Sequence, residues 1–392
     1  MSNKEVYGLF NDSFPPVLDG VTLTVQNYVR WLVDRGLPVT VITPWNPFDP
    51  AHPDFEMHRY FSLPIYNRHP YRYGYPRVDP FIWYNVRRTP FKIVHAHCPF
   101  SSGRIARYAS RYHCVPLVGT FHSKYRTDLE RSLPAWGVRW QMKRILDFYN
   151  ACDEVWIPQA AVEDTIREYG YRGQLRVVDN GNDLAGDLGG DLATVKSEAR
   201  RRLNIPSDRL TLLFVGQHIR EKGVHIIIDA LGLLKDKVDF EMHFIGTGYA
   251  TDEMKRHIVS LGLHDRVTLH GVLTDRHLLS DYYAAASLFL FPSMYDNAPL
   301  VVREAAMAGT PSILPLGSTA AEVIVNGSNG FLTDATSDAY ASLISRLDAD
   351  RDIIDTVGAG ARQSLARSWD DIMNEVFDHY QRIIRDYGNR HR

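Results

Sequence analysis

The chain has 392 residues, of which 45% are hydrophobic and 23% are charged. The length predicts two domains, and the composition is that of an ordinary soluble globular protein. No apolar run approaches the roughly 20 residues that a membrane-spanning helix needs. The first residues lack a charged leader and apolar core, so we expect no signal peptide. The cysteines lack metal-binding spacing and are expected to be reduced thiols of a cytosolic protein: Cys98, Cys114 and Cys152.

Charge is unevenly distributed along the chain. The net charge is −2, but residues 57–144 hold 16 Lys or Arg against three acids, so this window carries +13 and the remainder −15. The basic residues are mostly Arg and are interleaved with Tyr and Trp, which suits an anionic partner or a membrane surface. A solvated basic face, paired with acids of the other domain, is the alternative. Because no nucleic-acid-binding motif accompanies the charge, we expect no nucleic acid partner.

The first half of the chain alternates between apolar strands and helices. Strands are predicted at 5–10, 38–44, 91–97, 115–122, 154–158 and 175–183, and helices at about 21–35, 102–112 and 140–149. A long insert rich in aromatic and basic residues separates the second strand from the third. Continuous apolar strands separated by helices indicate a parallel sheet that is covered on both faces.

The second half repeats this pattern after a Gly-rich, acidic stretch at 184–193, which is predicted to be a linker. Strands are predicted at 210–216, 240–248, 267–271, 287–293 and 311–316, with a helix at 224–235. The fold class is therefore α/β, with two doubly wound, Rossmann-like domains facing each other across a cleft, where ligands usually bind. We expect domains at 1–184 and 185–367, followed by an amphipathic C-terminal helix within 368–392.

The segment 291–317, FPSMYDNAPLVVREAAMAGTPSILPLG, carries the strongest chemical signal. It places the carboxylates Asp296 and Glu304 eight positions apart, across the start of a helix that follows a buried strand. In an open α/β sheet, ligands bind outside the carboxyl ends of the strands. Helix N-terminal amides at this place attract anions such as a diphosphate. An ordinary strand-loop-helix with surface acids is the alternative.

Two glycine-containing loops contain further candidate ligand-binding residues. FPPVLDGV at 14–21 contains Gly20, which lets the backbone approach a ligand where a Cβ would clash, although a tight turn explains it almost as well. FVGQHIREKG at 214–223 follows a predicted strand and contains Lys222, whose ammonium group is a point charge suited to a phosphate. A solvated loop lysine is the alternative for Lys222.

Two further predicted strands have a histidine at their carboxyl end. VHAHCPF at 94–100 contains His97, and TFHSKY at 120–125 contains His122. A neutral imidazole at a strand end can hydrogen-bond or shuttle a proton. A lone histidine is more often a structural residue, and we regard His122 as the stronger candidate of the two.

Taken in chain order, these motifs resemble those of retaining family-4 glycosyltransferases. The pair Asp296 and Glu304 matches the family's E-x7-E motif with Asp in the first place, and 214–223 is similar to its V-G-R-x4-K-G motif. The likeness covers nearly the whole chain. It implies the GT-B fold, with an acceptor-side N-terminal domain, a nucleotide-sugar-binding C-terminal domain, and a last helix that crosses back to the first domain.

The resemblance also implies a role for each candidate residue. Asp296 would contact hydroxyls of the donor sugar, Glu304 would hold the ribose hydroxyls, and Lys222 would neutralise the donor diphosphate. His122 would face the donor sugar and the acceptor, so the expected catalytic residues are His122, Asp296 and Lys222. The other donor-binding residues are expected to be Gly20, Gln217 and, through amides facing the phosphates, Ala298, Pro299, Leu300 and Val301.

The sequence departs from the family pattern at two positions. Asp296 is one methylene shorter than the usual Glu, and Gln217 replaces an Arg that would bind phosphate. His218 or Arg220 is the candidate for supplying the missing charge. Two other motifs are decoys: Asp348-Ala-Asp350 resembles a metal motif of another glycosyltransferase class, and Gly246-Thr-Gly248 is half of a dinucleotide fingerprint. The resemblance implies neither a metal nor a cofactor.

The predicted function is that of a retaining glycosyltransferase, which moves a hexose from a nucleotide sugar, expected to be UDP-linked, to an acceptor. The resemblance implies front-face attack by the acceptor, without a covalent nucleophile. The acceptor is expected to be a lipid or an anionic glycan, with peripheral membrane contact, and a small soluble acceptor is the alternative. A GT-B nucleotide-sugar epimerase and a non-catalytic sugar-nucleotide-binding protein are the rival classes. The expected location is the cytoplasm, or the inner face of the membrane.

Overall fold

The structure is a computed structural model that describes residues 5–17, 19–48, 53–65, 71–130, 132–182, 184 and 190–390. The chain divides into two compact units. Unit 1 comprises Met1–Asn180 and Trp369–Arg392, and unit 2 comprises Gly181–Ser368. The division falls four residues before the predicted boundary at 184. Half of the predicted linker, at 185–189, lies outside the described residues.

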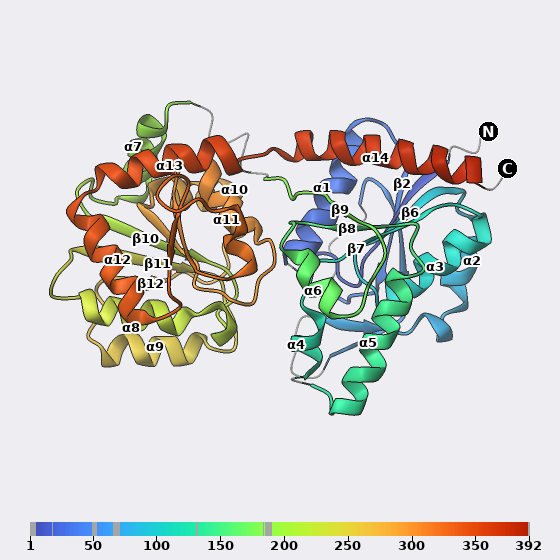
Figure 1. Cartoon of the computed structure of the whole chain (residues 1–392), viewed down its shortest axis with the longest axis horizontal. Coiled ribbons are helices and arrows are strands. Elements are labelled where there is room, and N and C mark those ends of the chain that lie inside the picture. Colours follow the sequence, from blue (N-terminus) through green and yellow to red (C-terminus); the bar gives the residue numbers. More distant parts are fainter. Residues whose placement is uncertain are drawn as a thin grey trace. The chain divides into compact units, whose positions relative to one another are not determined.

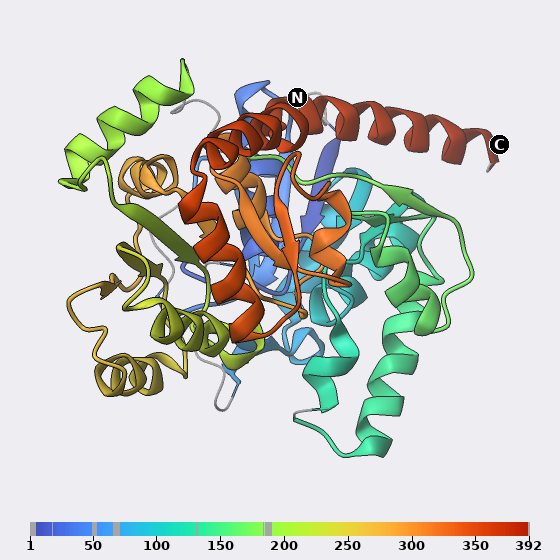
Figure 2. The same cartoon turned by 60° about the vertical axis from the view of Figure 1, so that its left-hand side comes forward.

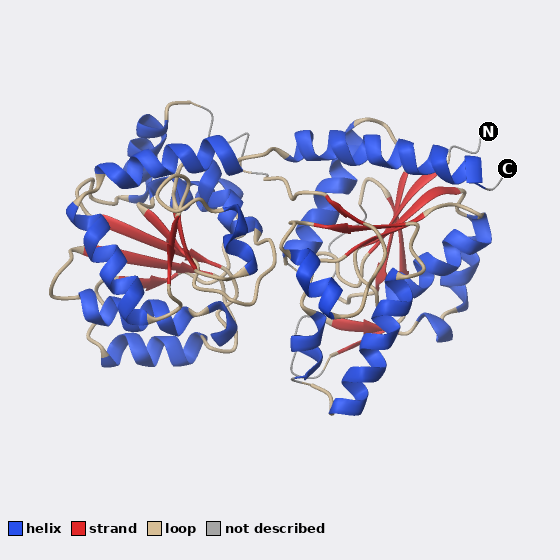
Figure 3. Ribbon diagram, viewed as in Figure 1, coloured by secondary structure: helices blue, strands red, loops and turns tan. Residues whose placement is uncertain are grey.

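Unit 1 is built around a parallel sheet, with helices on both faces (Figures 1 and 3). Its described strands run in the order β3-β2-β1-β6-β7-β8-β9. Their bounds are β1 Val6–Phe10, β2 Val39–Pro44, β3 Glu56–Tyr60, β6 Phe91–Ala96, β7 Leu117–Thr120, β8 Glu154–Ile157 and β9 Leu175–Val177. The chain winds outward from β1 to β3 and then returns to the other side of β1, so the topological switch point lies between β1 and β6.

Seven described helices belong to unit 1, and the first two begin at a capping aspartate. Their bounds are α1 Gly20–Asp34, α2 Pro80–Arg88, α3 Ser101–His113, α4 Tyr125–Glu130, α5 Ala135–Tyr149, α6 Val162–Glu168 and α14 Trp369–Arg390. The carboxylate of Asp19 accepts from the Thr22 amide at 2.7 Å at the start of α1. Asp79 does the same for α2, which has Pro80 at its first position, because that position needs no amide donor.

The aromatic-basic insert, to which the sequence assigned no element, is structured. It contributes the edge strand β3, an antiparallel pair formed by β4 Ser62–Pro64 and β5 Arg72–Gly74, the turn η1 Pro76–Val78, and helix α2. The strand β3 has the sequence EMHRY and is largely half-buried. It lacks the continuous apolar run by which the central strands were recognised, because an edge strand buries less of its surface.

The C-terminal helix α14 packs on unit 1 beside α1 (Figures 1 and 2). The hydroxyl of its buried Tyr380 bonds to His95 Nδ1 at 2.6 Å, inside β6. Gln381 Nε2 donates to the Tyr7 hydroxyl at 2.8 Å, and Arg382 pairs with Glu154 at 2.7 Å. Burial raises the pKa of Glu154, but hydrogen bonds from Arg382, Trp156 and Arg176 outweigh this and hold the pKa below its ordinary value.

Unit 2 is a second parallel sheet, whose described strands run in the order β12-β11-β10-β13-β14-β15. The strand bounds are β10 Leu210–Val215, β11 Phe240–Ile245, β12 Val267–Leu269, β13 Leu288–Leu290, β14 Ser312–Pro315 and β15 Phe331–Thr333. The helices are α7 Leu192–Leu203, α8 Val224–Leu234, α9 Thr251–Ser260, α10 Arg276–Ala285, α11 Leu300–Met307, α12 Ser337–Ala349 and α13 Asp352–Leu365, with turns η2 Arg220–Lys222 and η3 Thr319–Val323. The switch point lies between β10 and β13.

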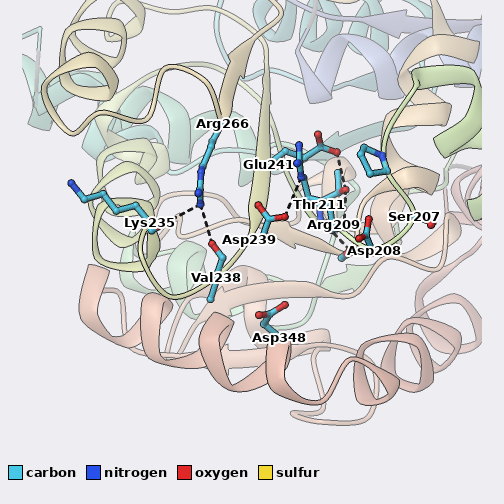
Figure 4. A network of polar contacts seen from close by, with 12 residues as sticks. Ser207, Asp208, Arg209, Thr211, Lys235, Val238, Asp239, Glu241, Arg266 and Asp348 are labelled. Atoms are coloured by element: carbon cyan, nitrogen blue, oxygen red, sulfur yellow. Dashed lines mark hydrogen bonds and ion pairs between the residues drawn. The ribbon is translucent and has the colours of Figure 1, made fainter.

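A polar network holds the edge where β10 and β11 begin (Figure 4). The Thr211 hydroxyl donates to Glu241 at 3.1 Å, and Arg266 donates to the carbonyls of Lys235 and Val238 at 3.0 and 3.1 Å, just beyond the end of α8. Asp348, which belongs to the Asp348-Ala-Asp350 motif, accepts from Arg351 at 2.5 Å. Arg351 also donates to the Asp208 carbonyl, so Asp348 takes part in a structural contact.

The helices of the described residues include none that is both long and apolar enough to span a bilayer. The same residues hold no group of three or more His, Cys, Asp or Glu side chains that could bind a metal ion. All three cysteines are free thiols.

We predict that Tyr380→Phe destabilises unit 1. The change removes the hydroxyl that bonds to His95 Nδ1, and an unsatisfied buried polar group costs about 1–3 kcal/mol. The free energy of unfolding, measured by urea denaturation, should fall by this amount. Tyr112→Phe removes the hydroxyl of an exposed tyrosine in α3, and should have little effect. Equal stability of the Tyr380→Phe variant and the wild type would refute the proposed anchoring.

Candidate active site

The candidate residues of unit 2 follow the two strands that flank its switch point. The loop after β10 leads through η2 to Lys222, and the loop after β13 contains Asp296. Because β10 and β13 are adjacent and parallel, their carboxyl ends lie at one edge of the sheet. In a doubly wound sheet, this edge is where the ligand crevice forms.

The structure brings Lys222 and Asp296 into direct contact. Lys222 Nζ lies 2.5 Å from Asp296 Oδ1, and the two side chains are only 14% and 17% exposed. The other carboxylate oxygen of Asp296 accepts from the Ser293 hydroxyl at 2.6 Å. The lysine ammonium also lies 5.2 Å from the centre of the ring of Phe291, the residue that directly follows β13. Asp296 is therefore held in place by two hydrogen-bond donors.

Glycines allow the loops at this edge to pack closely. Gly223 has φ +71° and turns the chain from η2 into α8. A Cβ at this position would lie 2.8 Å from the carbonyl oxygen of Pro292, in the loop after β13. Gly246 has φ +133°, and a Cβ there would lie 1.9 Å from the Gly216 carbonyl oxygen. The Gly246-Thr-Gly248 motif therefore lets the loops after β10 and β11 meet.

Glu304 lies inside α11, as its spacing predicted. It is the fifth residue of the helix and is buried. Its Oε1 accepts from Arg276 at 2.9 Å and its Oε2 accepts from the Tyr283 hydroxyl at 2.7 Å. Both partners belong to α10. A carboxylate oxygen can accept more than one hydrogen bond, and these two contacts orient the Glu304 carboxylate.

The predicted phosphate-facing amides lie at the start of α11. Leu300 and Val301 are its first two residues, and Pro299 is its N-cap. Proline has no backbone N–H, so the prediction that Pro299 contributes an amide is wrong. Ala298, Leu300 and Val301 remain possible amide donors at a helix start that favours negative charge.

Of the two candidates for the missing charge at Gln217, His218 does not fit that role. Gln217 is exposed, directly after Gly216. His218 is fully buried, and burial lowers its pKa to about 4, so its imidazole is neutral at physiological pH. Arg220 is exposed and forms an ion pair with Glu253. His218 therefore supplies no charge in place of the usual Arg, and the role of Arg220 stays a prediction.

Unit 1 places three imidazoles in contact at the carboxyl ends of β6 and β7. His97 Nδ1 lies 3.1 Å from His122 Nε2, and the two rings stack with their centres 5.4 Å apart. The ring centres of His95 and His97 are 4.1 Å apart, and His95 Nε2 bonds to the Thr120 hydroxyl at 2.7 Å. Gly20 is the exposed first residue of α1, after the capping Asp19, and its predicted contact with the donor stays a prediction.

These histidines are neutral at physiological pH. Burial lowers the pKa of His122 to about 4. Burial, together with the neighbouring imidazoles, lowers the pKa values of His95 and His97 well below the ordinary value. The Nε2 atom of His97 is buried and has no hydrogen-bond partner among the residues that the structure describes. An uncharged His122 can donate or accept one hydrogen bond at each ring nitrogen, according to its tautomer.

Sequence reasoning missed the residues that orient the candidates. Ser293 follows β13 and bonds Asp296, while Arg276 and Tyr283 hold Glu304. The spacing of Ser293 three residues before Asp296 is typical of a local side-chain turn and could have indicated this contact. Arg276 and Tyr283 lie 28 and 21 residues from Glu304 in the sequence, and no local pattern connects them.

Comparison with protein families gives two matches on successive parts of the chain. Residues 18–185 match the model described as "Glycosyltransferase Family 4". Residues 195–364 match the model described as "Glycosyl transferases group 1". The gap between the two matches lies close to the division between unit 1 and unit 2. The first match spans the described strands of the unit 1 sheet other than β1, and the second spans those of the unit 2 sheet.

Similar curated proteins are also glycosyltransferases. A GDP-mannose-dependent alpha-mannosyltransferase of Mycolicibacterium smegmatis is 25% identical over 95% of this chain and 96% of its own length. An alpha-monoglucosyldiacylglycerol synthase of Streptococcus pneumoniae is 24% identical over 78% and 70%. A D-inositol 3-phosphate glycosyltransferase of Xylanimonas cellulosilytica is 29% identical over 77% and 73%.

Solved structures show the same fold. A crystal structure of Anabaena HepE in complex with UDP and glucose superposes with a TM-score of 0.76 at 20% identity, over 96% of this chain and 99% of that one. The sucrose-phosphate synthase of Thermosynechococcus elongatus gives 0.77 at 20% identity, over 97% and 100%. With a family match on each half, the chain belongs to the GT-B glycosyltransferases, which transfer sugars from nucleotide-sugar donors.

Proposed function

We propose that this protein transfers a hexose from UDP to a lipid-linked or anionic acceptor, with retention of anomeric configuration. The observation that carries this proposal is the Lys222–Asp296 pair at the switch point of unit 2. It places a cation, and an acceptor for sugar hydroxyls, side by side beyond the strand ends. A nucleotide sugar requires this combination, because its diphosphate is anionic and its hexose presents hydroxyl groups.

Lys222 is proposed to stabilise the departing diphosphate. A lysine ammonium has three N–H donors, and the contact with Asp296 uses one of them. The others remain for phosphate oxygens, so Lys222 need not leave Asp296 when the donor binds. Because both side chains are largely buried, their electrostatic interactions are screened less than at a free surface. Stabilising charge that develops in the transition state is a major source of catalysis.

Asp296 and Glu304 are proposed to bind the two sugar rings of the donor. Asp296 would accept from hydroxyls of the hexose, and Glu304, held by Arg276 and Tyr283, would accept from those of the ribose. Charge-assisted hydrogen bonds of this kind are roughly twice as strong as neutral ones. The shorter Asp296 must reach its hydroxyl from the position that Ser293 gives it, which makes donor choice sensitive to this residue.

Retention is supported by the names of two relatives, and the contacts of Asp296 favour a route without a covalent intermediate. Asp296 is engaged by Lys222 and Ser293, which suits an oriented hydrogen-bond acceptor better than an attacking carboxylate. Two relatives are named for alpha-linked transfer, and an alpha product from an alpha-linked donor is what retention gives. We propose that the acceptor attacks on the face that the diphosphate leaves.

A GDP-linked mannose is a second candidate donor. The relative that aligns over nearly the whole chain is named as GDP-mannose-dependent, whereas a structure with the same fold was solved with UDP and glucose. Purified protein should be incubated with UDP-hexoses and with GDP-mannose, against diacylglycerol lipids and inositol phosphates, and the released nucleoside diphosphate measured. Release that depends on both a UDP-hexose and an acceptor would support the proposal. Free UDP without an acceptor would indicate the epimerase class instead.

We predict that Lys222→Ala and Asp296→Ala each lower turnover at least about tenfold, or about 1.4 kcal/mol. Each change removes one member of the pair and releases the other. Lys237→Ala and Asp236→Ala alter exposed residues after α8, and should stay within about twofold of the wild type, or about 0.4 kcal/mol. Circular dichroism should show that all four variants are folded. Wild-type rates in both site variants would disprove the assignment.

A second prediction concerns the neutral His122. In the unfolded chain a histidine titrates near pH 6.5, but folded His122 titrates at about pH 4. Between these values the unfolded state binds more protons, so stability falls as the pH is lowered through this window. His122→Asn should therefore reduce the slope of unfolding free energy against pH by up to about 1.4 kcal/mol per pH unit. The measurement is urea unfolding at pH 7, 6 and 5, and identical slopes would contradict the prediction.

A further inference from the structure

Helices α3 and α5 of unit 1, which lie side by side in Figure 1, enclose a cavity of about 210 Å³. Its walls are lined by residues of α3, of α5, of the loop before α3, and of β5. A second hollow of about 410 Å³ lies farther along α3 and shares Arg107 and Asp147 with the first. The two hollows therefore form one depression between the helices, and we call it the α3–α5 cavity.

Arginines dominate this cavity. Arg104 and Arg107 of α3 and Arg144 of α5 line the first hollow, and Arg111 lines the second. The spacing of the three α3 arginines, at i, i+3 and i+7, places them on one face of the helix. One carboxylate, that of Asp147, lines both hollows, and it already accepts from Lys143 at 2.9 Å. The local charge is therefore strongly positive.

The guanidinium groups lack protein counter-charges. Within the described part of the chain, Arg104, Arg107, Arg111 and Arg144 form no ion pair with a carboxylate. Arg107 Nε is buried without a hydrogen-bond partner, and its Nη1 reaches only the Asp147 carbonyl oxygen at 3.4 Å. Arg144 lies 4.5 Å from the centre of the Trp140 ring. That contact holds the guanidinium in place without neutralising its charge.

We propose that the α3–α5 cavity binds a phosphate group of a ligand. Clustered like charges repel one another, and an anion in the cavity would relieve this repulsion. Arginine is suited to phosphate because its planar group can donate two parallel hydrogen bonds. The cavity can also supply uncharged donors from Gln141 and Tyr73. The ligand class is a phosphate monoester or diester, either a free metabolite or a lipid headgroup.

This inference deepens the proposed function, because a phosphate held in unit 1 fits the lipid-linked or anionic acceptor proposed above, but it does not depend on the donor site. The cavity belongs entirely to unit 1, and its arginines do not include any residue assigned above to the donor site. Phosphate binding can be measured without a nucleotide sugar, so it can fail or succeed independently of glycosyl transfer.

The test compares two double variants of the full chain. Arg104→Gln/Arg144→Gln removes two charges from the cavity. Arg77→Gln/Arg139→Gln removes the same charge from exposed residues that line neither hollow. Binding of inorganic phosphate and glycerol 3-phosphate is measured by calorimetry without any sugar donor. We expect the first variant to raise the Kd at least about tenfold, or about 1.4 kcal/mol, and the control to match the wild type.

Folding is checked by thermal unfolding. Arg104→Lys/Arg144→Lys keeps the charges but removes the planar donor groups, so its affinity should lie between those of the wild type and the glutamine variant, and it tests the site even if the glutamine variant proves unstable. If phosphate binding is weakened equally in the cavity variant and the control variant, the proposal is overturned, because the effect would reflect net charge alone. Absence of any binding by the wild type, to the phosphate compounds and to anionic vesicles, would also overturn it.

The vesicle arm identifies the source of the phosphate. Sedimentation with phosphatidylglycerol vesicles, with phosphatidylcholine vesicles as the reference, is measured for the same variants. If the cavity binds a lipid headgroup, the wild type and the control sediment with phosphatidylglycerol and the Arg104→Gln/Arg144→Gln variant does so at least about tenfold more weakly, or about 1.4 kcal/mol. If only the soluble phosphates bind, and the cavity variant alone loses that binding, the site serves a free phosphorylated ligand.

Discussion

The reversal of winding direction in each parallel sheet is the constraint on which the rest of the structure depends. At a switch point, the first loops on either side lead away to helices on opposite faces, so a crevice remains between them. In unit 2 the strands at this point are β10 and β13, and their loops contain Lys222 and Asp296. In unit 1 the equivalent strands are β1 and β6, and the histidine group begins at the end of β6.

Close backbone packing converts this crevice into a defined site. Gly223 and Gly246 have positive φ, which most residues avoid. They allow three loops to approach until side chains on different strands form direct contacts. The resulting polar groups satisfy one another: Lys222 with Asp296, and Glu304 with Arg276 and Tyr283. Such mutual support fixes side-chain positions before a ligand arrives, which reduces the entropy that binding must offset.

The sequence predicted most of what depends on local pattern. Apolar runs located the central strands, and the eight-residue spacing placed Asp296 in a loop and Glu304 within a helix, where the structure has them. Prediction from the sequence failed where the burial of a residue depends on partners that are distant in the sequence. The edge strand β3 has polar residues because only part of it is covered. His218 was a candidate cation, but its surroundings in the fold make it neutral. Likewise, no local signal connected Arg276 or Tyr283 to Glu304.

The position of α14 has a consequence for the order in which the protein matures during synthesis. Unit 2 is one continuous stretch of chain, whereas unit 1 combines the first half with the last helix. A ribosome releases all of unit 2 before it releases α14. Until then, His95 Nδ1 and the Tyr7 hydroxyl lack the partners that Tyr380 and Gln381 supply. The half that is translated first is therefore the half that is completed last.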